Sequence, residues 1–179
     1  MDKGLIHLYY GNGKGKTTAA VGLCVRAAGY GFRILVYQFL KRPDSGEVSV
    51  LRSLPTVEYM ENTIEAPFFF SLTEEETSAY VKLYEDEFSK ISEKILSGQY
   101  DLCILDEVMD AVFHGLIDGQ KLLELLEKKP PCTELVLTGH KNKNGFLNPF
   151  IEKADYVTCF QKEKHPYDEG ISSRTGIEQ

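Results

Sequence analysis

A glycine-rich segment near the start of the chain has the composition of a phosphate-binding loop. It reads Gly-Asn-Gly-Lys-Gly-Lys-Thr-Thr over residues 11–18, between an apolar run and a segment with helical character. Glycines let successive backbone N–H groups turn toward one anion, and a helix that follows directs the positive end of its dipole there. In such a loop Lys16 would neutralise phosphate charge, and the hydroxyl of Thr17 would ligate Mg²⁺.

One position departs from the usual phosphate-loop pattern, G-x-x-x-x-G-K-[ST]. The pattern requires a glycine at position 10, where this chain has Tyr10, and Gly11 comes one residue late. The alternative is a glycine-rich turn that carries a solvated lysine. Three glycines, the Gly-Lys-Thr-Thr run and both flanking segments favour the phosphate loop.

A second segment, Ile-Leu-Asp-Glu at 104–107, has the form of a Walker B element. There a buried strand delivers a carboxylate to magnesium, so we predict that Asp106 binds the metal directly or through water. Glu107 could bind the metal, orient a nucleophile or hold a substrate hydroxyl. Alone, the Asp-Glu pair would be interpreted as a helix cap, but together with the glycine loop it favours a metal and phosphate site.

The elements that would position these residues alternate between strands and helices, which predicts an α/β fold with a parallel sheet. Apolar runs predict strands at 5–10, 34–39, 57–60, 102–105, 135–138 and 156–160. Helices are predicted at 17–28, at about 47–53, from a capping box at 73–76 to Gly98, at 122–127, and through 150–151. Because ligands bind beyond the carboxyl ends of parallel strands, Gly11, Lys41, Asp106 and Gly139 should border one site.

The composition indicates one globular domain over residues 1–179, with a polar, irregular C-terminal arm from about residue 162. Apolar and charged contents of 42% and 26% are ordinary for such a domain. The net charge of −7 argues against a nucleic-acid or anionic-membrane surface. Neither a long apolar run nor a signal-peptide pattern is evident, so we expect a cytoplasmic protein. Among the four dispersed cysteines, Cys24, Cys103 and Cys159 are expected to be buried, and no zinc site is signalled.

Taken with the glycine loop, several short segments resemble the P-loop type of ATP:cob(I)alamin (corrinoid) adenosyltransferase. They are Gln-Phe-Leu-Lys at 38–41, Gly-Glu at 46–47, Leu-Asp-Glu at 105–107, Leu-Thr-Gly at 137–139, Lys-His-Pro-Tyr-Asp-Glu-Gly-Ile at 164–171 and Gly-Ile-Glu at 176–178. The resemblance extends from Gly4 to Glu178. The family's loop also lacks the usual first glycine, which accounts for Tyr10.

The resemblance implies a single-domain RecA-like P-loop fold, a mostly parallel sheet with helices on both faces, and a homodimer. It also implies transfer of the 5′-deoxyadenosyl group of ATP to the Co(I) of cobalamin or another corrinoid, with release of triphosphate. Mg²⁺ is the implied cofactor, and an electron-donating reductase or flavodoxin-like protein is an implied partner. Co(I) is itself a strong nucleophile, so the protein has to hold the ribose 5′-carbon in line and stabilise the departing triphosphate.

By the same resemblance, each functional residue is assigned by matching its motif. Lys16 and Glu107 are the implied catalytic residues, and Thr17 and Asp106 the metal ligands. The implied ATP contacts are Asn12, Gly13, Lys14, Gly15, Lys16, Thr17, Thr18 and Arg26, and the implied corrinoid contacts are Phe68, Phe70, His165, Asp168 and Arg174.

Three features of the chain differ from the family's pattern. Where members carry Phe-x-Trp, this chain has three phenylalanines at 68–70, which would form an apolar wall beneath the corrin or else belong to the core. His140 stands where the family often has arginine, and that arginine's role is not carried over. Many members also have an N-terminal extension that closes over the site. This chain starts four residues before its first strand, so we expect the cover to be missing or supplied otherwise. His165, Asp168 and Arg174 would cover the nucleotide or corrin, or else lie on a solvated arm.

Two other functions are consistent with a phosphate loop. A small-molecule kinase would transfer the γ-phosphoryl group and would need an acceptor-activating base and a phosphate-clamping arginine. A non-catalytic ATP-binding switch would carry out no transfer. The products separate the three: adenosyl transfer yields triphosphate and a light-sensitive Co–C bond, a kinase yields ADP, and a switch yields little of either.

Overall fold

The computed structural model describes residues 2–41, 45–64, 73–142 and 145–178, and its centre is one six-stranded sheet. The strands are β1 (Ile6–Tyr10), β2 (Ile34–Gln38), β3 (Val57–Met60), β4 (Leu102–Asp106), β5 (Glu134–Gly139) and β6 (Tyr156–Cys159). Their order is β3-β2-β4-β5-β1-β6, and every pair is parallel. The predicted α/β class is confirmed, and the sheet is wholly rather than mostly parallel.

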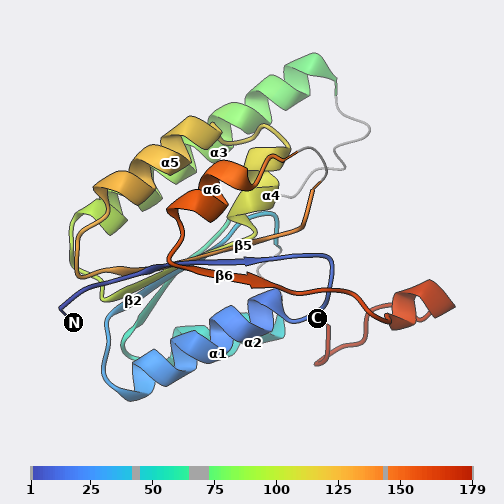
Figure 1. Cartoon of the computed structure of the whole chain (residues 1–179), viewed down its shortest axis with the longest axis horizontal. Helices are drawn as coiled ribbons and strands as arrows, with labels where there is room; N and C mark the ends of the chain where they lie inside the picture. Colours follow the sequence, from blue (N-terminus) through green and yellow to red (C-terminus); the bar gives the residue numbers. More distant parts are fainter. Residues whose placement is uncertain (1, 42–44, 65–72, 143–144, 179) are drawn as a thin grey trace.

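Helices cover both faces of this sheet (Figure 1). On one face lie α1 (Lys16–Gly29) and α2 (Gly46–Ser53). The opposite face carries α3 (Glu74–Leu96), α4 (Val108–Phe113), α5 (Gly119–Lys128) and α6 (Asn148–Lys153). This arrangement is the RecA-like P-loop fold. None of the described helices combines the length and apolar character needed to cross a membrane.

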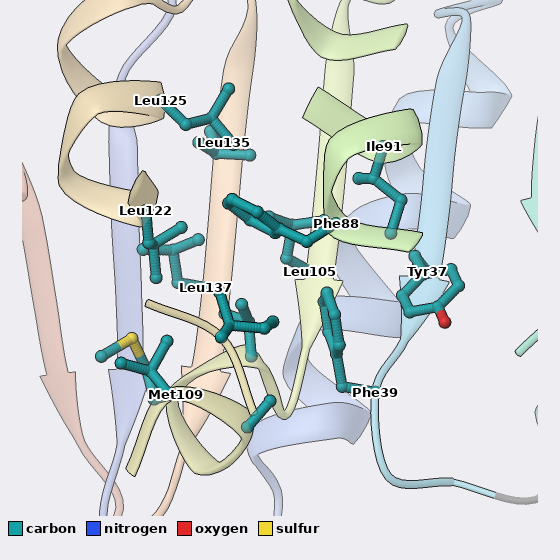
Figure 2. Close-up of a cluster of buried hydrophobic side chains, with 14 of the residues drawn as sticks. Tyr37, Phe39, Phe88, Ile91, Leu105, Met109, Leu122, Leu125, Leu135 and Leu137 are labelled. Carbon is teal, nitrogen blue, oxygen red and sulfur yellow. The ribbon is translucent and has the colours of Figure 1, made fainter. Parts of the chain in front are cut away.

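The side chains of the central strands alternate between two apolar clusters. Figure 2 shows part of the larger cluster, where Phe88 and Ile91 of α3 lie beside Leu105 and Leu137 of the sheet. The smaller cluster packs Ala20 and Cys24 of α1 against the opposite face, on Val36, Ile104 and Val136. Because both faces are covered, β2 and β4 are buried along their whole length, which explains their continuous apolar sequences.

Two sequence-based expectations need correction, and one helix was missed. The six-residue helix α4 directly follows Asp106-Glu107, and it was not predicted. The C-terminal arm is not wholly irregular, because Pro166–Glu169 forms a 3-10 helix, η2, in which the His165 side chain accepts the N–H of Tyr167. Cys159 is exposed rather than buried, because β6 pairs only with β1 and all four of its residues are exposed.

Strand register places the predicted site residues at one edge of the sheet. Tyr10 lies opposite Gly139, and Gln38 lies opposite Asp106. Gly11 then donates its N–H to the carbonyl of Gly139 at 3.2 Å. Gly11 has a φ of +128°, and a Cβ there would lie 2.2 Å from the carbonyl oxygen of Phe160. The loop therefore needs a glycine at its first turn.

The capping box predicted for α3 is present, and we use it to predict an effect on stability. The hydroxyl of Thr73 accepts the N–H of Glu76 at 3.2 Å, and the Glu76 carboxylate accepts the N–H of Thr73 at 2.8 Å. We expect Thr73→Ala to lower the free energy of unfolding by about 1 kcal/mol in urea titrations. Ser89→Ala, at an exposed position within the same helix, should change it by less than about 0.5 kcal/mol. Equal losses in the two variants would show that the box contributes nothing specific.

Candidate functional site

A cavity of about 1040 Å³ opens at the carboxyl edge of the sheet. Its walls come from the glycine loop and the first turn of α1, from the segments that follow β2 and β4, and from the C-terminal residues 176–178. Two residues other than glycine adopt left-handed backbone conformations in the described chain, Leu40 (φ 53°) and Glu107 (φ 58°), and both line this cavity. Strain of this kind concentrates at binding sites, since the surrounding structure must hold it.

The glycine loop wraps around the side chain of Lys16. The ammonium donates to the carbonyl oxygens of Gly11 at 2.9 Å and Gly13 at 3.1 Å, and the residue is buried. Burial lowers the pKa of Lys16, against the attraction of Asp110, Glu107 and Asp106. No side chain caps the N-terminus of α1, which begins at Lys16 after Gly15. The first amide groups of α1 therefore remain available to an anion in the cavity.

Thr17 and Asp106 lie side by side, as the metal-site prediction requires. The Thr17 hydroxyl is 3.1 Å from both carboxylate oxygens of Asp106. The hydroxyl of Thr138 and the amide of Gln38 donate to the same carboxylate, at 2.6 and 3.0 Å. These oxygen donors suit Mg²⁺, which takes one or two protein ligands and completes its shell with phosphates and water. No group of three His, Cys, Asp or Glu residues gathers as a metal site in the described chain.

The ammonium of Lys41 lies against the same pair of residues. It is 2.9 Å from the carboxylate of Asp106, 3.2 Å from the hydroxyl of Thr17 and 3.3 Å from the carboxylate of Glu47. Burial acts to lower the pKa of Lys41, but the combined attraction of Asp106, Glu107 and Glu47 and the hydrogen bond to Asp106 outweigh it, and the pKa is raised. Glu47 is held in turn by the Gln38 amide at 3.1 Å and the Ser45 hydroxyl at 2.5 Å.

Glu107 presents a carboxyl group to the cavity from the N-terminus of α4. Its backbone N–H donates to the Thr138 hydroxyl at 2.8 Å, which fixes the turn after β4. Burial, followed by the negative charge of Asp106, raises the pKa of Glu107 to about 7. Near neutral pH the carboxyl group therefore exists in both protonation states, and it can donate or accept a hydrogen bond with a ribose hydroxyl.

His140 contributes a further basic group to the cavity wall, besides the lysines. The carboxylate of Asp110 accepts the His140 backbone N–H at 3.1 Å and lies 3.1 Å from its Nδ1. This hydrogen bond raises the pKa of His140. Asp110 thus holds the imidazole at the end of β5, beside the glycine loop.

The structure brings most of the predicted ATP contacts together, though not all of them. Lys14, Gly15, Lys16, Thr17 and Thr18 line the cavity. Asn12 instead accepts the N–H of Lys141 at 3.2 Å, and Gly13 packs on the chain at Phe160. Arg26 lies in the last turn of α1, exposed and outside the cavity wall. Ten helical residues separate it from Lys16, which corresponds to roughly 15 Å.

The predicted corrinoid contacts lie mainly outside this cavity. Phe68 and Phe70 fall outside the described residues. His165, Asp168 and Arg174 belong to the C-terminal arm, where Asp168 pairs with Lys162 at 2.9 Å and Arg174 with Glu178 at 2.8 Å. His165, Arg174 and Glu178 border a small hollow of about 260 Å³ on the arm. The arm also meets the loop, because Lys14 donates to the carbonyl of Ile177 at 3.0 Å.

Sequence reasoning expected Lys41 to border the site but gave it no role. It did not assign site roles to four other residues that shape this cavity or hold its groups: Gln38, Glu47, Asp110 and Thr138. Their positions in the sequence could have pointed to the site, since they lie at or after the end of a predicted strand, or one helical turn beyond Asp106. What was missing was the strand order, which places β2 beside β4 and β5 beside both β4 and β1.

Comparison with known proteins gives consistent matches along the chain. Residues 2–179 match the family described as ATP:corrinoid adenosyltransferase BtuR/CobO/CobP. A corrinoid adenosyltransferase of Pseudomonas aeruginosa is 29% identical, over 99% of this chain and 84% of its own length. One from Escherichia coli K12 is 28% identical, over 99% of this chain and 86% of its own. A third, from a Sinorhizobium species, is 31% identical, over 99% of this chain and 81% of its own length.

Proposed function

We propose that the chain transfers the 5′-deoxyadenosyl group of ATP to a corrinoid and releases triphosphate. The reason is that the chain belongs to the ATP:corrinoid adenosyltransferase family. The main support for placing this function at the cavity is that three groups lie together there. They are the uncapped N-terminus of α1, the buried ammonium of Lys16 and the Thr17–Asp106 oxygen pair.

The reaction forms a bond between cobalt and the ribose 5′-carbon and breaks the bond between that carbon and the triphosphate oxygen. The electron pair comes from Co(I), and the leaving triphosphate takes the pair of the broken bond. The protein therefore needs no nucleophile of its own and acts by positioning and by electrostatic stabilisation. Lys16 and the first amide groups of α1 would bind the departing triphosphate, with Lys14 and Thr18 as further contacts. Glu107 would hold a ribose hydroxyl.

Mg²⁺ is the proposed cofactor, and its proposed ligands are Thr17 and Asp106. When bound, the ion would neutralise part of the triphosphate charge. The support is the oxygen donor set and the Lys41 ammonium, a cation that already lies against both residues. Thr138 and Gln38 hold the Asp106 carboxylate in place beside the hydroxyl of Thr17, which lines the cavity.

The same cavity gives less support to a kinase. Phosphoryl transfer usually depends on an arginine that clamps the transferred group. No arginine is among the described residues of the cavity wall. A non-catalytic switch is the other alternative, and the family match does not favour it.

The corrinoid would bind where the C-terminal arm meets the mouth of the cavity. Residues 176–178 of the arm line the cavity, and His165, Asp168 and Arg174 lie on the same arm. We propose that these three residues contact the corrinoid, and that Phe68 and Phe70 form an apolar wall beneath its ring. Such a wall would exclude an axial donor from cobalt, and four-coordinate Co(II) is easier to reduce.

This assignment predicts a selective effect of Phe68→Ala combined with Phe70→Ala. The double variant should keep its ATP affinity and lose most of the spectroscopic signal of four-coordinate Co(II) when ATP and cobalamin are bound. Its activity from Co(II) should fall several-fold more than its activity from pre-reduced Co(I). Electron paramagnetic resonance and parallel rate measurements test this. Equal losses from both cobalt states would place the two residues in general packing or substrate positioning.

The remaining proposals concern partners and location. Co(I) must be generated by reduction, so an electron-donating reductase or flavodoxin-like protein is the proposed partner. The four cysteines are free thiols, which suits a reducing compartment and supports a cytoplasmic location. A homodimer is proposed from the family resemblance, and sedimentation of the purified protein tests it.

Anaerobic incubation with chemically reduced cobalamin, ATP and Mg²⁺ tests the function. We expect the absorbance of an alkylated corrinoid to appear, and to revert to a non-alkylated form on exposure to light. A corrinoid spectrum that stays unchanged while ADP accumulates would support the kinase instead.

A further inference from the structure

The Lys41 ammonium occupies the position in which a cation bound to Thr17 and Asp106 would lie. It is 2.9 Å from the Asp106 carboxylate and 3.2 Å from the Thr17 hydroxyl, and these are the two groups proposed as metal ligands. The Asp106 side chain is only 2% exposed, so its charge needs a partner within the protein. In this structure Lys41 is that partner.

The backbone that leads to Lys41 places its ammonium beside Thr17 and Asp106. Phe39 donates its N–H to the Asp106 carbonyl at 2.8 Å, which ties the end of β2 to the end of β4. Leu40 then takes a left-handed backbone conformation (φ 53°), unfavourable for a residue with a Cβ. Lys41 follows, and its ammonium reaches Asp106 at the end of β4. Glu47 lies 3.3 Å from the ammonium on its other side and lines the cavity.

A bound Mg²⁺ and the Lys41 ammonium cannot share this position. Two cations in contact with one carboxylate repel each other strongly in a partly buried site. Lys41 has a flexible side chain that is 20% exposed and lines the same cavity as Lys16, Thr17 and Thr18. Once displaced, its charge would remain within the cavity that receives the triphosphate, where negative charge is in excess.

We propose that Lys41 is a further triphosphate-binding residue, which rests on the metal ligands in the nucleotide-free protein and is displaced onto the triphosphate when Mg²⁺ and ATP bind. This proposal rests on the metal site of the proposed function. Its consequence is a pair of opposite effects. Lys41 competes with metal when nucleotide is absent, and it strengthens ATP binding when metal is present.

Mn²⁺, which is detected directly by electron paramagnetic resonance, is the probe for the first effect. In nucleotide-free protein, Lys41→Met should bind Mn²⁺ at least about tenfold more tightly than the parent, because an opposite charge in contact shifts a carboxylate's affinity for a cation by that order. The gain should disappear when Asp106→Asn is added. Lys90→Met is the matched control, since Lys90 pairs with Glu87 on the exposed surface of α3. It should leave the Mn²⁺ affinity unchanged.

Titration calorimetry with ATP at saturating Mg²⁺ measures the second effect. Lys41→Met should bind ATP roughly tenfold more weakly, with Lys90→Met again unchanged. Lys41→Gln, which keeps a polar side chain, should behave like Lys41→Met in both measurements, and circular dichroism reports whether each variant is folded. A purely structural ion pair would not give effects of opposite sign.

The outcomes separate this proposal from the proposed function. If the parent binds Mn²⁺ in the presence of ATP but Lys41→Met leaves the nucleotide-free Mn²⁺ affinity unchanged, the metal site stands and the Lys41 proposal is wrong. If Lys41→Met binds ATP as tightly as the parent at saturating Mg²⁺, the Lys41 proposal is also wrong. If neither protein binds Mn²⁺ with or without ATP, the metal site of the proposed function fails, and the Lys41 proposal fails with it.

Discussion

Replacing Lys16 with alanine is expected to lower the rate of adenosyl transfer about 100- to 1000-fold while leaving the fold intact. Lys16 is the buried cation of the glycine loop, and the structure already holds its ammonium between the Gly11 and Gly13 carbonyls. A preorganised charge of this kind requires little rearrangement as negative charge builds on the leaving triphosphate. Losing such a contact typically raises the barrier by about 2.7–4 kcal/mol.

Single-turnover rates with pre-formed Co(I) measure the effect of Lys16→Ala without the reduction step. Lys14→Ala is the comparison, because the Lys14 ammonium is exposed and bound to the Ile177 carbonyl rather than enclosed by the loop. Lys14→Ala should lower the single-turnover rate less than Lys16→Ala does. Near-normal turnover by a folded Lys16→Ala protein would contradict the phosphate-loop assignment.

The second large effect is expected at Asp106, in the metal requirement. Asp106→Asn removes the negative charge but keeps the size of the side chain, so the concentration of Mg²⁺ needed for half-maximal activity should rise about 10- to 100-fold. Asp101→Asn is the control, because Asp101 directly precedes β4, at the opposite end of the strand, and pairs with Arg33 on the surface. Superimposable magnesium titrations for Asp106→Asn and the parent would mean that Asp106 only supports the turn after β4.

The site could be predicted from the sequence where it depends on local pattern. Residues 11–18 carry their own signal, because glycine spacing and the Lys-Thr pair define the loop before any tertiary contact is known. Asp106 was identified because a buried apolar strand runs directly into it. Parallel pairing then required both to lie at one edge of the sheet, and the hydrogen bond between Thr17 and Asp106 confirms this geometry.

Features that depend on strand order and on exposure could not be predicted in this way. The contact between Lys41 and Asp106 exists because β2 and β4 are neighbours, although their sequences are far apart. Helix α4 spans only six residues, too few for a periodic pattern, and starts after the left-handed turn at Glu107. Cys159 was expected to be buried because it lies in the interior of a predicted strand, but that strand is at the edge of the sheet, which leaves Cys159 exposed.

The phosphorus-containing product tests the central claim most directly. Phosphorus-31 NMR can follow ATP and Mg²⁺ incubated with the protein and cob(I)alamin under anaerobic conditions. The account predicts triphosphate as a single released product, in equal amount to the adenosylated corrinoid, because the bond that breaks joins the ribose carbon to the intact triphosphate. ADP, or phosphate released without alkylation of the corrinoid, would contradict it.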